Sequence, residues 1–444
     1  MTPEEKKEQR NLKRRKRLER EKKITVPLFA FIGMVLAILM LTLLLWSTKR
    51  RQNAHLDVAQ PGELRELLPS IVGLTHGTLL EGNSLQILRN GAFFNSVLAE
   101  IAKAKETINF ETYVWWKGDI CRQIAEALSK KAREGLEVRL LVDASGSSRS
   151  DDELFEMMEQ AGVKIGRFHP VRISNLGRLN NRDHRKIVVI DGRIGFTGGH
   201  GVAEEWTGNG QDLKHWSDIF VRVEGPIVGT LQSAFTENWI EETSNVPAGA
   251  KFFPKLEPKG SIPIHAAYSS PSGTVSSVQL LYYLAINAAK KEILIQNPYF
   301  LPDDDAISAL EKAVERGVDV RVMIPSTDVT DSAIVQHASH HHFGTLLKRG
   351  VKIYEYKKTL LHQKVLVVDG YWSSVGSTNF DDRSFELNDE ISLGIHDTGV
   401  AEQLRTIFFE DMKFTEERKF DEWSDRALKH KAIDGMAFLV NEQL

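Results

Sequence analysis

The sequence predicts an α/β fold in which two homologous α/β sandwich halves pack with pseudo-twofold symmetry, preceded by one N-terminal transmembrane helix. The first observation is an internal repeat, because DHRKIVVIDG at 183–192 recurs as LHQKVLVVDG at 361–370. The second is that each half alternates strand-like runs with helical ones, an order typical of α/β folds. The third is the uncharged apolar segment 24–48, which is long enough to cross a bilayer core of roughly 30 Å as a helix.

Charge is distributed unevenly around the apolar segment. Residues 1–23 hold eleven Lys and Arg against five Glu, and Lys49, Arg50 and Arg51 follow the segment. Because the cytoplasmic flank of a membrane helix is the more basic one, we predict a single-pass protein of the cell (inner) membrane with a cytoplasmic N-terminus and its body on the outer or periplasmic side. A cleaved signal peptide is the weaker interpretation, since the segment has neither a short apolar core nor a small-residue cleavage site. The basic tail either binds anionic lipid headgroups or only fixes the topology.

The repeat and the composition divide the chain into five segments. We expect a basic cytoplasmic tail, a transmembrane helix, a linker with a lead-in, a first half, and a second half with C-terminal helices. Their ranges are 1–23, 24–48, 49–85, 86–250 and 251–444. The connection between the halves is expected at 244–263, which is rich in Pro, Gly and Lys. The tail from residue 414 predicts one or two amphipathic helices that close the second half.

Most elements of the first half have a counterpart in the second. The matching segments are 105–115 with 291–301, 133–143 with 315–325, and 161–165 with 349–356. Helices are expected at Asp119–Arg133 and Ala306–Arg316. Strands alternating with helices in this way predict a largely parallel sheet in each half.

The repeated stretch carries polar residues at both ends of an apolar run. The four β-branched residues of Ile187–Ile190 predict a buried strand that ends in an Asp-Gly turn. Side chains alternate along a strand, so the His and the Lys before it point the same way. The matched residues, all 178 positions apart, are His184, Lys186 and Asp191 in the first copy and His362, Lys364 and Asp369 in the second. The same offset links Gly198 to Gly376, and we predict one paired site assembled between the halves.

The charge of the body argues against a nucleic-acid partner. The whole chain carries −3, but its first 51 residues contribute +9, which leaves −12 for residues 52–444. General nucleic-acid binders depend on a basic surface, so none is expected here. The single cysteine, Cys121, excludes an intramolecular disulfide framework and a multi-cysteine metal site, and we expect it in the core of a helix.

Two histidines and two lysines that face one another are suited to phosphodiester transfer. One imidazole attacks as a nucleophile, while the other protonates the leaving group and later activates the acceptor. The lysines supply positive charge for a non-bridging phosphate oxygen without a metal. Asp191 and Asp369 either orient an imidazole or only turn the chain, because Asp-Gly after a strand is also an ordinary turn signal. The implied reaction passes through a covalent phosphohistidine and requires no cofactor.

The two His-x-Lys-x4-Asp copies, followed at a fixed distance by Gly-Gly or Gly-Ser, resemble the paired HKD motifs of the phospholipase D superfamily. Three further strings resemble its bacterial cardiolipin synthase branch: HWSDIFVRVEGPIVGTLQSAFTENW (215–239), QNPYFLPDD (296–304) and GSTNFDDRSFELNDE (376–390). The resemblance covers roughly residues 85–420 and implies two phospholipase D-like halves.

The resemblance implies phosphatidyl transfer between membrane phospholipids. A histidine attacks the phosphate of one lipid, the headgroup leaves, and the glycerol hydroxyl of phosphatidylglycerol accepts the phosphatidyl group, giving cardiolipin and glycerol. By this likeness His184 is the nucleophile and His362 the general acid and base, although the sequence alone does not separate the two roles. Lys186 and Lys364 bind phosphate in the same scheme, and the motif aspartates are supporting residues.

Four further residues take roles from the resemblance. Asp218 and Glu390 fall where the family has carboxylates that hold the histidines. Ser377 and Asn379 match its Gly-Ser-x-Asn phosphate-site pattern. The position that corresponds to Asn379 in the first half is Gly201, so the expected site is asymmetric.

Features outside the motifs allow simpler interpretations. Four histidines cluster at QHASHHH, but no spaced carboxylate or cysteine accompanies them, so we expect a polar helix face and no metal. They are His337, His340, His341 and His342. Trp115 and Trp116 either touch acyl chains or the membrane interface, or pack within the protein.

Three functions remain open from the sequence. The first is a membrane-bound phosphatidyltransferase with phospholipid substrates. The second is a hydrolase of the same superfamily acting on lipid or, less favoured by the acidic body, on nucleic acid, because no motif residue distinguishes water from a second lipid. The third is a non-enzymatic membrane scaffold, which the two complete motifs disfavour. The donor lipid, the acyl preference and the oligomeric state stay open.

Overall fold

The computed structural model describes residues 10, 12–16, 29–42, 56, 58, 62–170, 180–271 and 275–438. The chain forms two compact units, Met1–Ala54 and His55–Leu444. In the first unit residues 29–42 form a helix with exposed apolar side chains. Among the described residues, no helix is both long and apolar enough to cross a membrane. Both ends of the predicted segment 24–48 and most of the basic tail 1–23 lie outside the described residues.

One mixed sheet runs through the second unit, and 16 strands of its described residues belong to it. Their order is β16-β12-β11-β10-β13-β14-β15-β9-β1-β8-β7-β6-β2-β3-β4, with β5 paired to β15. The earlier strands are β1 (Leu80–Arg89), β2 (Thr107–Thr112), β3 (Glu137–Asp143), β4 (Lys164–Phe168), β5 (Arg182–Asp183), β6 (Ile187–Ile190), β7 (Ile194–Gly198) and β8 (Ile219–Glu224). The later strands are β9 (Ile262–Ser269), β10 (Glu292–Gln296), β11 (Asp319–Pro325), β12 (Lys352–Tyr356), β13 (Val365–Val368), β14 (Trp372–Gly376), β15 (Asn388–His396) and β16 (Thr415–Arg418).

The strand order repeats on the two sides of the central β1–β9 pair. From β1 outward the order is β8-β7-β6-β2-β3-β4, and from β9 outward it is β15-β14-β13-β10-β11-β12. The two copies of the apolar run occupy matching places, because they form β6 and β13. Among the described strands, the edge strand β16, beyond β12, and the short β5 have no match, and β16 forms where the sequence predicted a helical tail.

The expectation of a largely parallel sheet is wrong. Parallel pairing is confined to β2–β3–β4, β10–β11–β12 and the short β5–β15 pair. The hairpins β6–β7 and β13–β14 are antiparallel, since a short connection cannot make the long crossover that parallel strands need. Both connections turn through consecutive residues with positive φ, at Asp191 (52°) with Gly192 and at Asp369 (54°) with Gly370.

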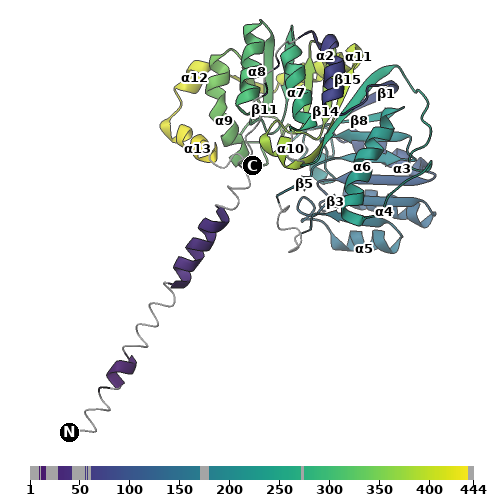
Figure 1. The fold of residues 1–444 in the computed structure, drawn as a ribbon, viewed down its shortest axis with the longest axis horizontal. Coiled ribbons are helices and arrows are strands. Elements are labelled where there is room, and N and C mark those ends of the chain that lie inside the picture. Colours follow the sequence, from purple (N-terminus) through teal and green to yellow (C-terminus); the bar gives the residue numbers. More distant parts are fainter. Residues whose placement is uncertain are drawn as a thin grey trace. The chain divides into compact units, whose positions relative to one another are not determined.

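Helices cover both faces of the sheet. Figure 1 shows α3 to α6 around the first half, and α2 and α7 to α9 around the second. The helices are α2 (Leu64–Leu74), α3 (Ala92–Lys103), α4 (Asp119–Arg133), α5 (Asp152–Gln160), the 3-10 turn η2 (Glu204–Trp206), α6 (Ile227–Thr243), α7 (Ser277–Ala288), α8 (Asp304–Glu315), α9 (Ala333–Lys348), α10 (Asp382–Glu386), α11 (Thr398–Met412), α12 (Phe420–Ser424) and α13 (Leu428–Phe438). Cys121 lies buried on α4, as expected.

The apolar run of each motif is buried on both faces of the sheet. In β6, Val188 and Ile190 pack into the core beneath α3 to α5, while Ile187 and Val189 enter a core that contains α6 and α11. That second core also takes alternate residues of β13, so it is shared by both halves. Burial on both faces explains why the run is continuously apolar instead of alternating with polar residues. The strands that lead to the site are thus fixed on both sides.

The predicted lead-in, 49–85, contributes to the second half. It contains α2 and the start of β1. Leu64 and Ile71 of α2 join the core beneath α7 and α8. Together with the β1–β9 pair, this packing ties the beginning of the body to the later half of the chain.

Candidate active site

His184 lies between β5 and β6, at the mouth of the first motif strand. Its Nδ1 is 2.8 Å from Oε1 of Glu390, which lies on β15 of the other half. The carboxylate is fully buried and the histidine is 8% exposed, so little of the ring reaches solvent. Among the described residues no hydrogen bond engages Nε2 of His184, which leaves that nitrogen for a substrate.

His362 holds the matching position before β13. Its Nδ1 is 2.7 Å from Oδ2 of Asp218, which directly precedes β8 of the first half. Asp218 is fully buried, and His362 is 8% exposed. Each histidine is therefore held by a carboxylate from the opposite half.

The two carboxylates occupy equivalent positions. In the first half Gly198 pairs with Phe220, and Asp218 lies two residues before Phe220. In the second half Gly376 pairs with Ser392, and Glu390 lies two residues before Ser392. Backbone hydrogen bonds also cross between the halves. His184 N donates to Asp389 O at 3.0 Å, and His362 N donates to Ser217 O at 2.7 Å. Short cross-half β pairing at β5–β15 and at Ser217–Leu361 positions both histidines.

The motif lysines lie beside their own histidines. Lys186 Nζ donates to the carbonyl of His184 at 2.6 Å, and Lys364 Nζ donates to that of His362 at 2.8 Å. Lys364 Nζ also lies 2.9 Å from both ring nitrogens of His362. Both lysines are almost completely buried, and a buried cation of this kind requires anionic partners or an anionic ligand.

Each carboxylate also accepts a hydrogen bond from a further side chain. Ser377 Oγ donates to Oε2 of Glu390. Trp206 Nε1 donates to Oδ2 of Asp218 at 2.9 Å, in addition to the contact with His362. Gly199 is the counterpart of Ser377, and a Cβ there would lie 2.3 Å from Oδ1 of Asp218. The two halves thus hold their carboxylates by different side chains.

Asn379 is buried, and its Oδ1 has no hydrogen-bond partner among the described residues. Its first-half counterpart, Gly201, leaves no room for a side chain, because a Cβ there would lie 2.7 Å from Val114. The asymmetry expected from the sequence therefore has a steric basis.

The two motif aspartates do not contact the histidines. Asp191 accepts hydrogen bonds from the backbone amides of three consecutive residues, 105 to 107, at 2.8–3.2 Å. Asp369 accepts from the amides of residues 290 to 292 at 2.7–3.2 Å. Of the two interpretations from the sequence, these contacts fit the chain turn, and the imidazoles are instead bonded to Asp218 and Glu390.

Burial and mutual repulsion set the charges of the histidines and lysines. Burial lowers the pKa of His184 well below its usual value, and Lys186 and Lys364 lower it further. Burial and Lys364 lower the pKa of His362 to about 4, against the opposing effect of Asp218. Burial also lowers the pKa of Lys186 to about 7 and that of Lys364 to about 8. A bound anion would therefore favour the charged forms of these histidines and lysines, which burial disfavours.

The two carboxylates differ in acidity. Burial raises the pKa of Glu390 to about 7, although Lys186 opposes the shift. Burial also acts to raise the pKa of Asp218, but His200 and His362 outweigh it and lower the value to about 2. Asp218 is accordingly ionised at neutral pH, whereas Glu390 is close to its titration midpoint.

Aromatic rings surround the histidines, and the sequence did not predict the closest ones. Tyr113 packs against His184 at 5.0 Å between ring centroids, and Trp206 and Trp216 pack against His362 at 5.2 and 5.9 Å. Of the two tryptophans singled out from the sequence, Trp115 is fully buried in the first-half core. Trp116 packs against Trp206 and Trp216, one ring further from His362. Trp206 and Trp216 lie between β7 and β8, and the repeat gave no signal for them because the matching segment between β14 and β15 has no tryptophan.

The comparisons with known proteins agree with these motifs. The family described as cardiolipin synthase, PLD-like domain, matches residues 97–239 and 282–412. The chain is 33% identical over 383 residues to cardiolipin synthase 2 of Staphylococcus epidermidis, with 85% of this chain and 78% of that protein covered. It is 33% identical over 384 residues to the major cardiolipin synthase ClsA of Bacillus subtilis, with 85% and 79% covered.

Solved structures share the fold at low sequence identity. Phosphatidylserine synthase of Haemophilus influenzae matches with a TM-score of 0.66 at 14% identity, over 85% of this chain and 100% of that chain. Polyphosphate kinase of Porphyromonas gingivalis matches with a TM-score of 0.51 at 13% identity, over 80% of this chain and 53% of that chain. At such identities the likeness concerns the fold alone.

Proposed function

The chain belongs to the cardiolipin synthase family of phospholipase D-like proteins, and we propose that it transfers phosphatidyl groups through a phosphohistidine formed between its two halves. It is a cardiolipin synthase-like phosphatidyltransferase. The observation that carries the mechanism is the exchange of carboxylates, in which each motif histidine is oriented by the opposite half. An oriented imidazole has one nitrogen held and the other aimed at the substrate.

In the first step His184 is the nucleophile. Its Nδ1 is bonded to Glu390, so Nε2 attacks the phosphorus of the donor lipid and a P–N bond forms. The P–O bond to the headgroup breaks at the same time. For phosphatidylglycerol the leaving group is glycerol, whose oxygen takes a proton from His362.

In the second step His362 acts as a base. It accepts the proton of a hydroxyl on the glycerol headgroup of a second phosphatidylglycerol, and that oxygen attacks the phosphorus. The P–N bond breaks and His184 is regenerated. The products are cardiolipin and the glycerol released in the first step, so no oxidant, reductant or external energy source is consumed.

The difference between the carboxylates supports this division of roles. Asp218 is ionised, with a pKa of about 2, and an adjacent anion favours the imidazolium form of His362. A bound phosphodiester would add a further negative charge and raise the pKa of His362 above its value of about 4. Glu390 has a pKa of about 7, so it is only partly ionised at neutral pH and favours the cation of His184 less strongly. An imidazole must be neutral to act as a nucleophile.

The remaining predicted residues bind phosphate or support the scaffold. Lys186 and Lys364 neutralise the non-bridging oxygens and stay cationic when the phosphodiester is bound. Ser377 holds Glu390, and the Nδ2 amino group of Asn379, which makes no hydrogen bond among the described residues, would donate to the phosphate. Asp191 and Asp369 act on the turns that follow the motif strands, and no step of the reaction passes through them.

The arrangement of the chain around this site is part of the proposal. The matching strand orders outward from β1 and β9 support two phospholipase D-like halves related by a pseudo-twofold, with domains near 86–250 and 251–444. The apolar segment 24–48 and the basic residues around it support a single-pass anchor in the cell membrane, with the catalytic body on the outer side. Such an anchor would keep the site close to its phospholipid substrates.

Product analysis tests the reaction. Purified full-length protein is incubated in detergent micelles with phosphatidylglycerol, and the lipids and free glycerol are identified by mass spectrometry. Cardiolipin with one glycerol per turnover is the expected result. Phosphatidic acid alone would assign the chain to the hydrolases, and absence of any product would contradict both.

Histidine variants test the mechanism. His184→Ala and His362→Ala should each abolish transfer, and His430→Ala, at an exposed histidine of α13, should leave it unchanged. Quenching wild-type protein during turnover should yield a phosphatidyl adduct on the peptide that contains His184. An adduct on the His362 peptide instead would reverse the two roles.

A further inference from the structure

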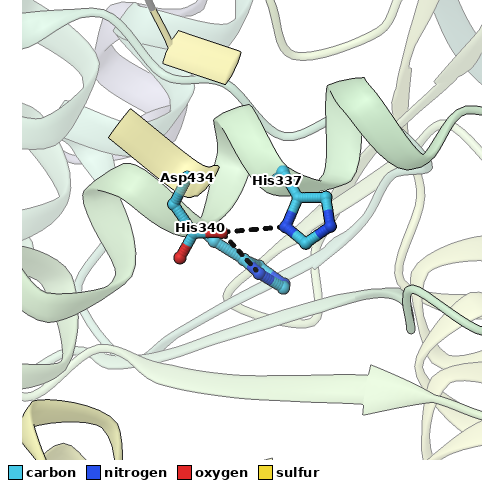
Figure 2. Close-up of side chains that lie close together, drawn as sticks. All are labelled: His337, His340 and Asp434. Atoms are coloured by element: carbon cyan, nitrogen blue, oxygen red, sulfur yellow. Dashed lines mark hydrogen bonds and ion pairs between the residues drawn. The ribbon is translucent and has the colours of Figure 1, made fainter. Parts of the chain in front are cut away.

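A second cluster of ligand-type side chains lies outside the proposed active site, between α9 and α13. His337 and His340 lie one turn apart on α9, and Asp434 of α13 faces them (Figure 2). Asp434 Oδ1 is 2.9 Å from His337 Nδ1 and 3.7 Å from His340 Nδ1. One ligand atom from each residue lies within 4.8 Å of the others. Asp434 and His340 are buried, and His337 is partly exposed.

These separations suit a tetrahedral metal ion. Imidazole nitrogen and carboxylate oxygen bind Zn²⁺ at roughly 2.0–2.2 Å, which places neighbouring ligand atoms about 3.4 Å apart. The two observed separations lie on either side of that value. All three ligand atoms lie within 4.8 Å of one another, so an ion requires the side chains to move toward a common centre.

The outer contacts orient the ligand atoms toward the centre of the cluster. His340 Nε2 is 3.1 Å from Oε1 of Glu355, a buried carboxylate on β12. A ring proton on Nε2 donates to that carboxylate and leaves the Nδ1 lone pair directed at Asp434 Oδ1. Metal-binding histidines usually have this arrangement, with a carboxylate on the nitrogen opposite the metal.

The aspartate is held in a corresponding way. Arg426 Nη1 donates to Asp434 Oδ2 at 2.7 Å, while Oδ1 faces the cluster and is bonded to His337 Nδ1 at 2.9 Å. At 3.7 Å the facing Nδ1 of His340 is too far from Oδ1 for a hydrogen bond, so two acceptor atoms face each other across a gap. A metal cation in that gap would bind both atoms and would replace the proton that His337 Nδ1 shares with Oδ1.

We propose that His337, His340 and Asp434 bind one Zn²⁺ ion, with water in the fourth position. The residues come from α9 and α13, which pack side by side (Figure 1). The ion therefore fastens α13 onto α9. Its role is structural, because none of its ligands contacts either motif histidine.

Metal titration of the full-length protein tests the site. The protein is treated with EDTA, freed of chelator, incubated with Zn²⁺, and its bound zinc is measured by mass spectrometry after gel filtration. One equivalent per chain is expected, with a rise in melting temperature on binding. Less than half an equivalent under saturating zinc would overturn the proposal.

Matched variants on α9 separate this site from adventitious binding. His337→Gln should lose the bound zinc and the thermal shift, while His342→Gln, a histidine on the same helix outside the cluster, should keep both. Asp434→Asn should behave like His337→Gln, and because His337 is partly exposed, its variant remains informative if the buried one fails to fold. Zinc retained by His337→Gln, or lost equally from His342→Gln, would contradict the assignment.

Discussion

Nδ1 of His362 lies 2.7 Å from Oδ2 of Asp218, which joins a histidine of the second half to a carboxylate of the first. The reciprocal contact, between His184 and Glu390, completes the exchange. Neither half has a complete site on its own, because the group that orients its histidine belongs to the other.

Replacing Asp218 tests the exchange directly. Asp218→Asn keeps the shape but removes the charge that favours the imidazolium of His362, so kcat should fall roughly 10²- to 10⁴-fold with little change in KM. Steady-state kinetics with phosphatidylglycerol measure both constants. Asp212→Asn is the matched control, because Asp212 is bonded to the surface histidine His215 at the same 2.7 Å. Full activity in Asp218→Asn would rule out the orienting role.

Glu390 should show a pH-dependent requirement. With a pKa of about 7, the Glu390 carboxyl is mostly protonated below pH 7, and the neutral amide of Gln mimics that form. Above pH 7 the carboxyl is mostly ionised, and Gln lacks its charge. The ratio of wild-type to Glu390→Gln kcat should therefore rise about three- to tenfold from pH 6 to pH 8. The corresponding ratio for Asp218→Asn should stay constant, since the pKa of Asp218 is about 2. A flat ratio for Glu390→Gln would contradict the difference between the two carboxylates.

Asp191 should affect stability and not chemistry. Asp191→Ala removes a carboxylate that accepts three backbone amides, and it places Ala at a φ of 52°. We expect a loss of about 2–4 kcal/mol in the free energy of unfolding, measured by urea denaturation, with an unchanged rate per folded molecule. Asp191→Asn should lose less, since the Asn carbonyl oxygen still accepts hydrogen bonds and Asn tolerates positive φ. A folded Asp191→Ala protein with a greatly reduced kcat would restore the catalytic interpretation.

We expect that residue 199 must be glycine for Asp218 to keep its position. A Cβ at this residue would lie 2.3 Å from Oδ1 of Asp218, so Gly199→Ala must displace the carboxylate from His362. Displacement of an orienting group by about 1 Å costs on the order of 10²-fold in rate, and we expect a kcat loss of that size. Gly229→Ala is the control, because the nearest atom to its Cβ would be 3.7 Å away. Wild-type kcat in Gly199→Ala would show that Asp218 can move without consequence.

Local patterns predicted the motif strands and the histidines and lysines at their ends. The β-branched run of Ile187–Ile190 forms β6, and its repeat forms β13. The same reasoning failed for sheet direction, because the connections after the two runs are too short for parallel crossovers. It also missed Trp206 and Trp216, because the matching connection between β14 and β15 has no tryptophan.

The sequence by itself determined the duplicated strands, the His/Lys pairs and the membership of the family, since these depend on residue type and spacing along one segment. The resemblance also pointed to Asp218 and Glu390 as carboxylates that hold the histidines, and the tertiary structure decided which histidine each one contacts. Asp218 is 144 residues from His362, Glu390 is 206 from His184, and Asp434 is 97 from His337. Periodicity acts over a few residues, whereas these contacts depend on how the central β1–β9 pair and the helices pack. In this packing Asp191 and Asp369 accept hydrogen bonds from backbone amides, and carboxylates from the opposite half contact the histidines.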